Sequence, residues 1–293
     1  MTDTRDRVTA PPTPAWQPPK IGDVNILEVS IGARGSGKST AQAARALELQ
    51  RELGAYVIGH SLGRRLPREI PAGSDLPFAG SRLPLAYHAS IEQLDRGLRK
   101  APASFHVLAP ALTAEGGPPA DERDTADDLI QYVIRLSAGI RRRAWEQANP
   151  WRRFDPNRAD YTGLRAPPVI LIVDEGIAVE AADRNARRDD RWFHEFLYSL
   201  RHLHVGMLWA IQEPSARSWK IIEAATECHV YQVRHEWALQ ALRSAGAGAD
   251  GIEQIRQLDL YECYTIHGGA RRRERVPAPD AAPAGADVAK VAT

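Results

Sequence analysis

One stretch of the chain carries the spacing of a phosphate-binding loop. It reads Gly-Ala-Arg-Gly-Ser-Gly-Lys-Ser from Gly32 to Ser39 and matches the pattern GxxxxGK[ST] in full. Glycines let a backbone curl until several N–H groups point at phosphate oxygens, and a helix that follows adds its positive N-terminal end. In such a loop Lys38 reaches the β- and γ-phosphates, and the Ser39 hydroxyl binds Mg²⁺. The residues expected to contact ATP are Gly32, Ala33, Arg34, Gly35, Ser36, Gly37, Lys38, Ser39 and Thr40.

Two adjacent acidic residues follow an apolar stretch further along the chain. Residues 168–173 read Pro-Val-Ile-Leu-Ile-Val and lead directly into Asp174 and Glu175. An apolar run of this kind is typical of a parallel strand that is buried on both faces, and acids at its carboxyl end face the ligand crevice. We therefore expect Asp174 to hold Mg²⁺ through water and Glu175 to polarise the attacking water, which favours hydrolysis. The alternative is that these acids only end a strand or cap the next helix.

Apolar segments that could form strands alternate with segments of helical periodicity. The strand candidates are 24–31, 55–60, 104–108, 169–173, 205–211, 229–233 and 261–266. The helix candidates are 39–53, 90–100, 124–147, 192–203, 218–226 and 236–245. This alternation predicts an α/β fold with a mostly parallel central sheet flanked by helices. The phosphate loop then stands between a strand and a helix, as its chemistry requires.

The other segments are polar or rich in proline. Residues 1–20 contain five prolines and are expected to form a flexible arm. Residues 269–293, basic at first and then rich in Ala and Pro, are expected to form a disordered tail. The ATPase domain is placed between them, at 21–268. Within it, residues 61–85 are expected to be a long loop, and residues 109–167, apart from their helix, an insertion.

The bulk composition is that of an ordinary globular protein, with 43% hydrophobic and 26% charged residues. A net charge of +1 provides no global field towards nucleic acid, so any DNA contact has to come from local patches. The two cysteines argue against a disulfide framework and fit a reducing compartment. No apolar run reaches the roughly 18 residues of a membrane span, and the N-terminal residues have no signal-peptide pattern. We therefore expect a cytoplasmic protein.

The order of these motifs resembles the FtsK–HerA superfamily of DNA-translocating ATPases over roughly residues 22–268. That family often shows Thr-Gln-Arg-Pro after an apolar strand. Here Gln212 and Pro214 match, whereas Ile211 and Glu213 replace the threonine and the arginine. The resemblance implies a RecA-like P-loop NTPase fold of the additional-strand, catalytic-glutamate type. It also implies that Gln212 contacts the γ-phosphate or the lytic water; a strand-end amide that only satisfies backbone groups is the alternative.

Several relatives of this kind supply an arginine finger from the segment before the glutamine motif. Arg201 stands in the matching place, eleven residues before Gln212. The alternative is a helix arginine in a surface salt bridge. Arg234, at the end of a strand candidate, is the second candidate, and Arg217 is the third. A finger that inserts into a neighbour's site implies a ring, and the resemblance suggests a hexamer.

Clusters of arginine could contact DNA phosphates, or they could simply be solvated faces. They lie at Arg141–Arg143, at Arg152–Arg153 beside Trp151, at Arg187–Arg188 and at Arg271–Arg273. The region from Arg141 to Arg153 is the preferred pore element, since it belongs to the expected insertion. The cluster at Arg271–Arg273 is expected to lie on the tail.

The layout is most similar to genome-packaging ATPases of membrane-containing double-stranded DNA viruses. This implies an ATP-driven translocase of double-stranded DNA that works in the host cytoplasm or at a packaging vertex of the virion, with capsid-vertex or membrane proteins as partners. One alternative is a plasmid or mobile-element DNA-transfer ATPase that works with a separate membrane partner. A second alternative is a nucleotide-switched assembly protein that does not bind DNA.

Overall fold

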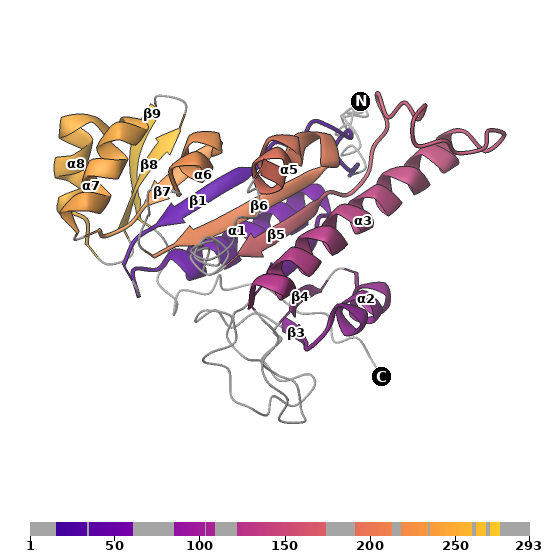
Figure 1. Ribbon diagram of the computed structural model, residues 1–293, viewed down its shortest axis with the longest axis horizontal. Coiled ribbons are helices and arrows are strands. Elements are labelled where there is room, and N and C mark those ends of the chain that lie inside the picture. The colour runs from indigo at the N-terminus through magenta and orange to yellow at the C-terminus, as the bar shows by residue number, and fades with distance from the viewer. Residues whose placement is uncertain are drawn as a thin grey trace, which may run out of the picture.

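The computed structural model describes residues 16–33, 35–60, 85–102, 104–108, 122–173, 191–212, 218–233, 235–259, 262–267 and 270–275. The strands in these ranges are β1 (Leu27–Ile31), β2 (Tyr56–His60), β3 (Leu85–His88), β4 (Phe105–Leu108), β5 (Val169–Val173), β6 (Val205–Ile211), β7 (Glu227–Val230), β8 (Glu262–His267) and β9 (Ala270–Arg275). They form one sheet in the order β3-β4-β2-β5-β6-β1-β7-β8-β9 (Figure 1).

The sheet is parallel from β3 to β7 and antiparallel only at β8 and β9. The expected α/β fold with a mostly parallel sheet is therefore confirmed. β6 pairs with both β1 and β5, so one additional strand separates the strand before the glycine-rich loop from the strand that leads to Asp174. This order is the one that the additional-strand type of P-loop fold requires.

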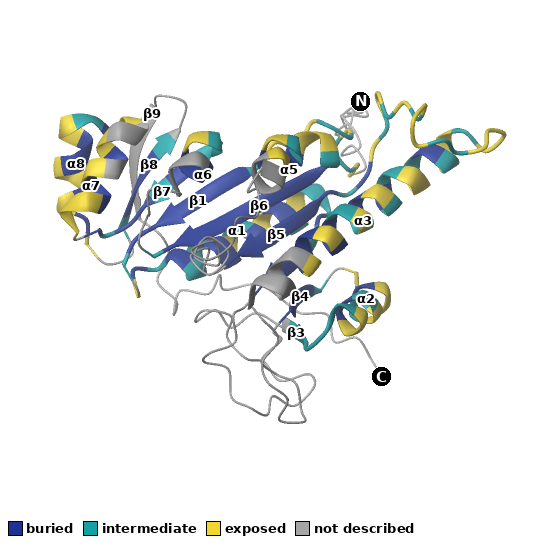
Figure 2. Ribbon diagram, in the orientation of Figure 1, coloured by how far each residue is buried: buried dark blue, intermediate teal, exposed yellow. Residues whose placement is uncertain are grey.

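Helices cover both faces of the sheet. They are α1 (Lys38–Leu53), α2 (Ile91–Lys100), α3 (Glu122–Ala148), α5 (Arg191–Leu203), α6 (Ser218–Ala224), α7 (Glu236–Leu242) and α8 (Gly248–Arg256). The small side chains Ala43 and Ala46 of α1 pack on one face, against alternate residues of β5 such as Ile170. The remaining helices pack on the other face in a larger core. β1, β5 and β6 are buried along their whole length, because both of their faces are covered (Figure 2).

The connection from α5 to β6 is held by side chains of α3. His204 makes this turn in the left-handed conformation, with φ 58°, and is fully buried. The C-terminal carbonyls of a helix lack partners within the helix. Here Ser137 Oγ donates to the carbonyl of Leu203, and Arg141 Nη1 donates to that of His202 at 3.0 Å. α3 is therefore part of the core, and only its last turns and the following loop project from it (Figure 1).

Two strands and one helix differ from the sequence-based expectation. Residues 270–275 form β9 and do not belong to the tail, because they pair antiparallel with β8 along its whole length. The row of arginines suits an edge strand, where charge discourages pairing with other chains. Residues 85–88 form β3, at the opposite edge. The last predicted helix ends at Leu242 and is followed by a π-helical turn and α8, since Gly246 adopts φ 100°.

Candidate nucleotide-binding site

The glycine-rich loop lies at the carboxyl end of β1 and opens directly into α1. Gly35 and Gly37 adopt the left-handed φ values of 80° and 102° that glycine tolerates without strain. Gly37 is the N-cap of α1, but no side chain caps this helix end and no acidic residue lies in its first turn. The backbone N–H groups and the helix dipole at this end therefore favour an anion.

Lys38 lies inside the loop that it belongs to. Its Nζ donates to the carbonyl oxygens of Gly32, at 2.6 Å, and of Ala33, at 2.9 Å, and the residue is only 5% exposed. A buried ammonium needs hydrogen-bond acceptors, and these two carbonyls hold it in the curl of the backbone. The ammonium is thus placed within the loop, where a phosphate would add a further acceptor.

Neighbouring strands clamp the start of the loop. The N–H of Gly32 donates to the carbonyl of Ile211 at the end of β6, and the N–H of Ala33 donates to Gln232 just after β7. A side chain at position 32 would collide with Tyr231, whose Cβ lies 2.7 Å from the place of the added atom. Sequence spacing did not reveal Tyr231 and Gln232 as neighbours of the loop. The register of β1 with β7, which continues past Ile31, brings them there.

Two polar side chains around the loop have no hydrogen-bond partner among the described residues. They are the hydroxyl of Ser36 in the loop and the amide of Gln42, one turn beyond Lys38 in α1, and each residue is only 3% exposed. Buried polar groups are nearly always hydrogen-bonded in folded proteins. These two residues therefore fit a site in which further polar groups complete the contacts, as a bound nucleotide with Mg²⁺ would.

The other residues expected at the site fall into two groups. Gln212 directly follows Ile211, which pairs with Ile31, so Gln212 and Gly32 leave adjacent strands at the same edge of the sheet. β5 also ends at this edge, at Val173. Asp174 and Glu175, which come next in the chain, lie outside the described residues, as do Arg34, Arg217 and Arg234.

Arg201 lies at the amino-terminal ends of the parallel strands, whereas the glycine-rich loop lies at their carboxyl ends. It precedes β6, whereas Gln212 follows β6, so a strand of seven residues separates the two, which is roughly 20 Å. The Arg201 side chain is exposed, and its Nε donates to the carbonyl of Gly22 at 2.6 Å. The structure therefore brings Gln212, but not Arg201, to the loop of the same chain.

The arginine clusters differ in what they contact. Arg141 is half-buried, and its guanidinium lies over the Tyr161 ring as well as on the carbonyl of His202. Burial lowers the pKa of Arg141, although the nearby Tyr161 opposes this. Its guanidinium is therefore part of the packing and not a free surface charge. Arg187–Arg188 and the side chains of β9 lie outside what the structure describes.

A polar ladder lies beside α1, on the pair of strands β1 and β7. Arg45 of α1 binds Glu28 at 2.9 Å, and His229 Nε2 lies 3.8 Å from Glu28 and 3.5 Å from Glu227. Two carboxylates and an imidazole could hold a divalent cation in principle. The guanidinium and a protonated imidazole already balance both carboxylates, so we assign the group as an ion-pair ladder that holds α1 against the sheet.

The charge of His229 should make stability depend on pH. Burial opposes protonation, but interactions with the neighbouring Cys263 and with the Glu28 carboxylate raise the pKa of His229 to about 9. The unfolded chain loses this proton near pH 6.5. The resulting stabilisation, on the order of 3 kcal/mol, is fully present below pH 6.5 and is lost as the pH rises through 9. Urea unfolding of His229→Gln should therefore show a large deficit at pH 6 and a small one at pH 10.

The exposed His202 provides the control for this experiment. Unfolding of His202→Gln should follow the wild-type curve at both pH values. A deficit of His229→Gln that is equally large at pH 6 and pH 10 would show that the residue acts through packing and not through its charge.

The sheet order, the loop and its helix together define the fold of a P-loop NTPase. Neither protein-family models nor curated protein sequences give a match. Among solved structures, the chain is similar to the genome packaging NTPase B204 from Sulfolobus turreted icosahedral virus 2 in complex with AMPPCP. The TM-score is 0.55 and the identity 13%, over 86% of this chain and 98% of that one. B204 from Sulfolobus turreted icosahedral virus, described as a DNA-packaging ATPase, gives the same TM-score and identity, over 86% and 97%.

The pCW3 conjugation coupling protein TcpA with ATPγS gives a TM-score of 0.48 at 13% identity, over 85% of this chain and 59% of that one. At the identity of the two viral structures the likeness concerns the fold alone, which is that of a P-loop NTPase. Within the described residues, no helix has the length and apolarity of a membrane span.

Proposed function

We propose that this protein is an ATPase that uses ATP hydrolysis to move double-stranded DNA, as the packaging motor of a viral genome. The observation that carries the proposal is the loop from Gly32 to Ser39, with Lys38 inside it, at the edge where β1, β5 and β6 all end. The likeness to B204, described as a DNA-packaging ATPase, directs the proposal towards DNA. We place its action in the host cytoplasm, at a capsid vertex.

Each site residue then has a defined task. The loop N–H groups and Lys38 hold the phosphates, and Thr40 lies in the first turn of α1 beside them. Ser39 and Asp174 would hold Mg²⁺, which offsets the negative charge of the phosphates when bound. Glu175 orients and polarises the attacking water. Gln212 contacts the γ-phosphate or that water from the end of β6.

Arg201 fits this scheme only as a residue that acts on a neighbouring subunit. It is exposed and lies roughly a strand length from its own loop, so it cannot reach phosphates bound there. In a ring, proposed to be a hexamer, the same residue would complete the site of the adjacent copy, where a guanidinium stabilises charge in the transition state. Its hydrogen bond to Gly22 would have to open for this.

A DNA-stimulated ATPase assay tests the proposal. The full-length oligomer should hydrolyse ATP slowly alone and several-fold faster with duplex DNA. Slow hydrolysis that duplex DNA leaves unchanged, in an oligomer that is folded, would instead indicate a nucleotide-switched protein without DNA as its partner.

Replacing Glu175 with glutamine should separate binding from hydrolysis. The amide keeps the shape of the side chain but cannot polarise water, so we expect turnover to fall by about 100-fold or more while ATP affinity stays near the wild-type value. Single-turnover hydrolysis and equilibrium binding of ATP measure the two effects. Glu253→Gln, at an exposed position of α8, is the matched control and should hydrolyse ATP normally. Normal turnover in the Glu175 variant would remove this residue from the catalytic role.

A further inference from the structure

The end of α3 and the loop after it form a projecting arm, defined here as residues 141–158. Figure 1 shows α3 running past the sheet, with the arm at the end remote from the arrowheads of β1 and β6. The chain returns from the arm beside the N-terminal segment, where the N–H of Ile21 donates to Leu164 and that of Ala166 to Pro19. The arm therefore lies at the amino-terminal edge of the sheet, opposite the glycine-rich loop.

The loop of the arm is fixed to its helix. The rings of Trp145 and Phe154 meet edge to face at 5.5 Å, and Arg142 lies over the Phe154 ring at 5.2 Å. The Asn149 amide donates to the carbonyl of Trp145, and the N–H of Arg152 donates to Asn149. These contacts hold the tip in one shape, so that a partner would not have to order it on binding.

The tip presents an aromatic ring among unpaired positive charges. Trp151 is 96% exposed, the largest exposed fraction among the exposed large apolar side chains of the described chain. Arg143, Arg152 and Arg153 are also exposed and form no ion pair within the described residues. Six arginines and two acidic residues lie in the arm, whereas the whole protein has a net charge of only +1. The positive charge is therefore concentrated locally.

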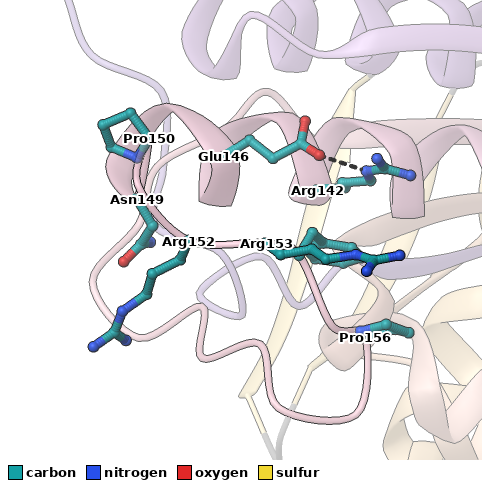
Figure 3. A pocket seen from close by; sticks show the side chains of 8 residues that line it. Arg142, Glu146, Asn149, Pro150, Arg152, Arg153 and Pro156 are labelled. Atoms are coloured by element: carbon teal, nitrogen blue, oxygen red, sulfur yellow. Dashed lines mark hydrogen bonds and ion pairs between the residues drawn. The ribbon is translucent and has the colours of Figure 1, made fainter.

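A groove runs between α3 and the returning loop. It has a volume of about 680 Å³ and is lined by Arg142, Glu146, Arg152 and Arg153 among others. Figure 3 shows the Arg142–Glu146 ion pair along the helix, with Arg153 extended on the same side as Arg142 and Arg152 pointing away. One acidic residue and three arginines line the groove, and only Arg142 pairs with the acidic one, so the groove keeps an excess of positive charge.

From these features we propose that the arm binds the phosphate backbone of duplex DNA through Arg143, Arg152 and Arg153, with Trp151 contacting the sugars and base edges of the minor groove. One guanidinium group can bind two phosphate oxygens at once. An apolar ring beside such groups can enter the minor groove of DNA. A protein partner of neutral charge would leave three arginines without counter-charges. The inference rests on the proposed function and names the surface through which that function would engage DNA.

Duplex binding without nucleotide, over a range of salt concentrations, tests the arm. Arg152→Gln with Arg153→Gln should weaken binding at least tenfold and reduce the slope of log K against log salt by about 2, since each phosphate contact contributes about 0.9. Trp151→Ala should weaken binding by about five- to tenfold with little change of slope. The control is Arg96→Gln with Arg99→Gln, two exposed arginines on α2, which should bind as the wild type does.

The possible outcomes separate this inference from the proposed function. Weaker binding of both arm variants, with normal binding of the α2 control, supports the arm. If the arm variants bind duplex DNA with wild-type affinity and keep DNA-stimulated hydrolysis, the proposal for the arm is wrong and the proposed motor function stands. Altered self-association with unchanged DNA binding assigns the arm to a contact between copies and also overturns it. Absence of duplex binding by the wild type overturns both.

Discussion

Replacing Lys38 with alanine should abolish ATP hydrolysis. The substitution removes the ammonium that two loop carbonyls hold inside the curl, and with it the charge that would contact the β- and γ-phosphates. Loss of a single charge-stabilising donor typically costs about 100- to 1000-fold in turnover, and here the same group also contributes to binding. Steady-state hydrolysis and equilibrium binding of ATP measure the two parts of the loss.

Lys38→Arg is the matched variant, because it keeps the charge and changes the shape. A guanidinium is planar and longer, and the narrow space between the carbonyls of Gly32 and Ala33 should not accept it. We therefore expect both variants to be inactive while their far-ultraviolet circular dichroism stays native. An alanine variant that hydrolyses ATP at a wild-type rate would show that the loop is not the nucleotide site.

The sequence predicted most of the central sheet because central strands of a parallel sheet leave a clear pattern. Buried on both faces, β5 and β6 appear as unbroken apolar runs with boundaries that the structure confirms. Edge strands leave no such pattern. β3 is short and was not predicted, since only its first residue fell in the expected loop 61–85, and β9 is mostly arginine, so composition assigned it to the tail.

The motif pattern also predicted the loop, but not its surroundings. Spacing along the chain reveals residues that act together only when they are close in sequence. Tyr231 and Gln232 reach the loop because β7 pairs with β1, some two hundred residues away in the chain. The ladder of Glu28 and His229 corresponds to a pattern in the sequence, since polar residues alternate with apolar ones in both β1 and β7. The register between these two strands could not be read from the sequence.

Only the burial seen in the structure could distinguish an arginine that packs against the fold from one that is exposed on the surface. Arg141 and Arg143 are two residues apart and identical in type. One is half-buried on a helix-end carbonyl, and the other is exposed. The sequence could not make that distinction, because α3 meets the end of α5 only in the folded protein. A cluster of three arginines is thereby reduced to one that is free to bind a partner, with a second occupied by Glu146 and Phe154.

Gly32→Ala should disrupt the loop without removing any charged or polar group. An added Cβ would lie 2.7 Å from Tyr231 Cβ and 3.1 Å from Ser36 Oγ, and the Cβ of Tyr231 cannot move without its backbone. Overpacking of this kind costs about 1–3 kcal/mol, and here it would push the loop away from β7. We expect lower stability to urea together with a loss of ATP binding of tenfold or more, because the N–H groups leave their positions.

Two other glycines separate the possible causes of this effect. At Gly139, on α3, an added Cβ meets nothing within 4 Å, so alanine there should be neutral or slightly stabilising. At Gly35 there is also open space, but φ is 80°, so Gly35→Ala tests backbone strain in the loop without a collision. If Gly32→Ala binds ATP as tightly as Gly139→Ala does, the contact between the loop and Tyr231 does not shape the site. If only Gly32→Ala and Gly35→Ala lose binding, the conformation of the loop itself is what ATP recognises.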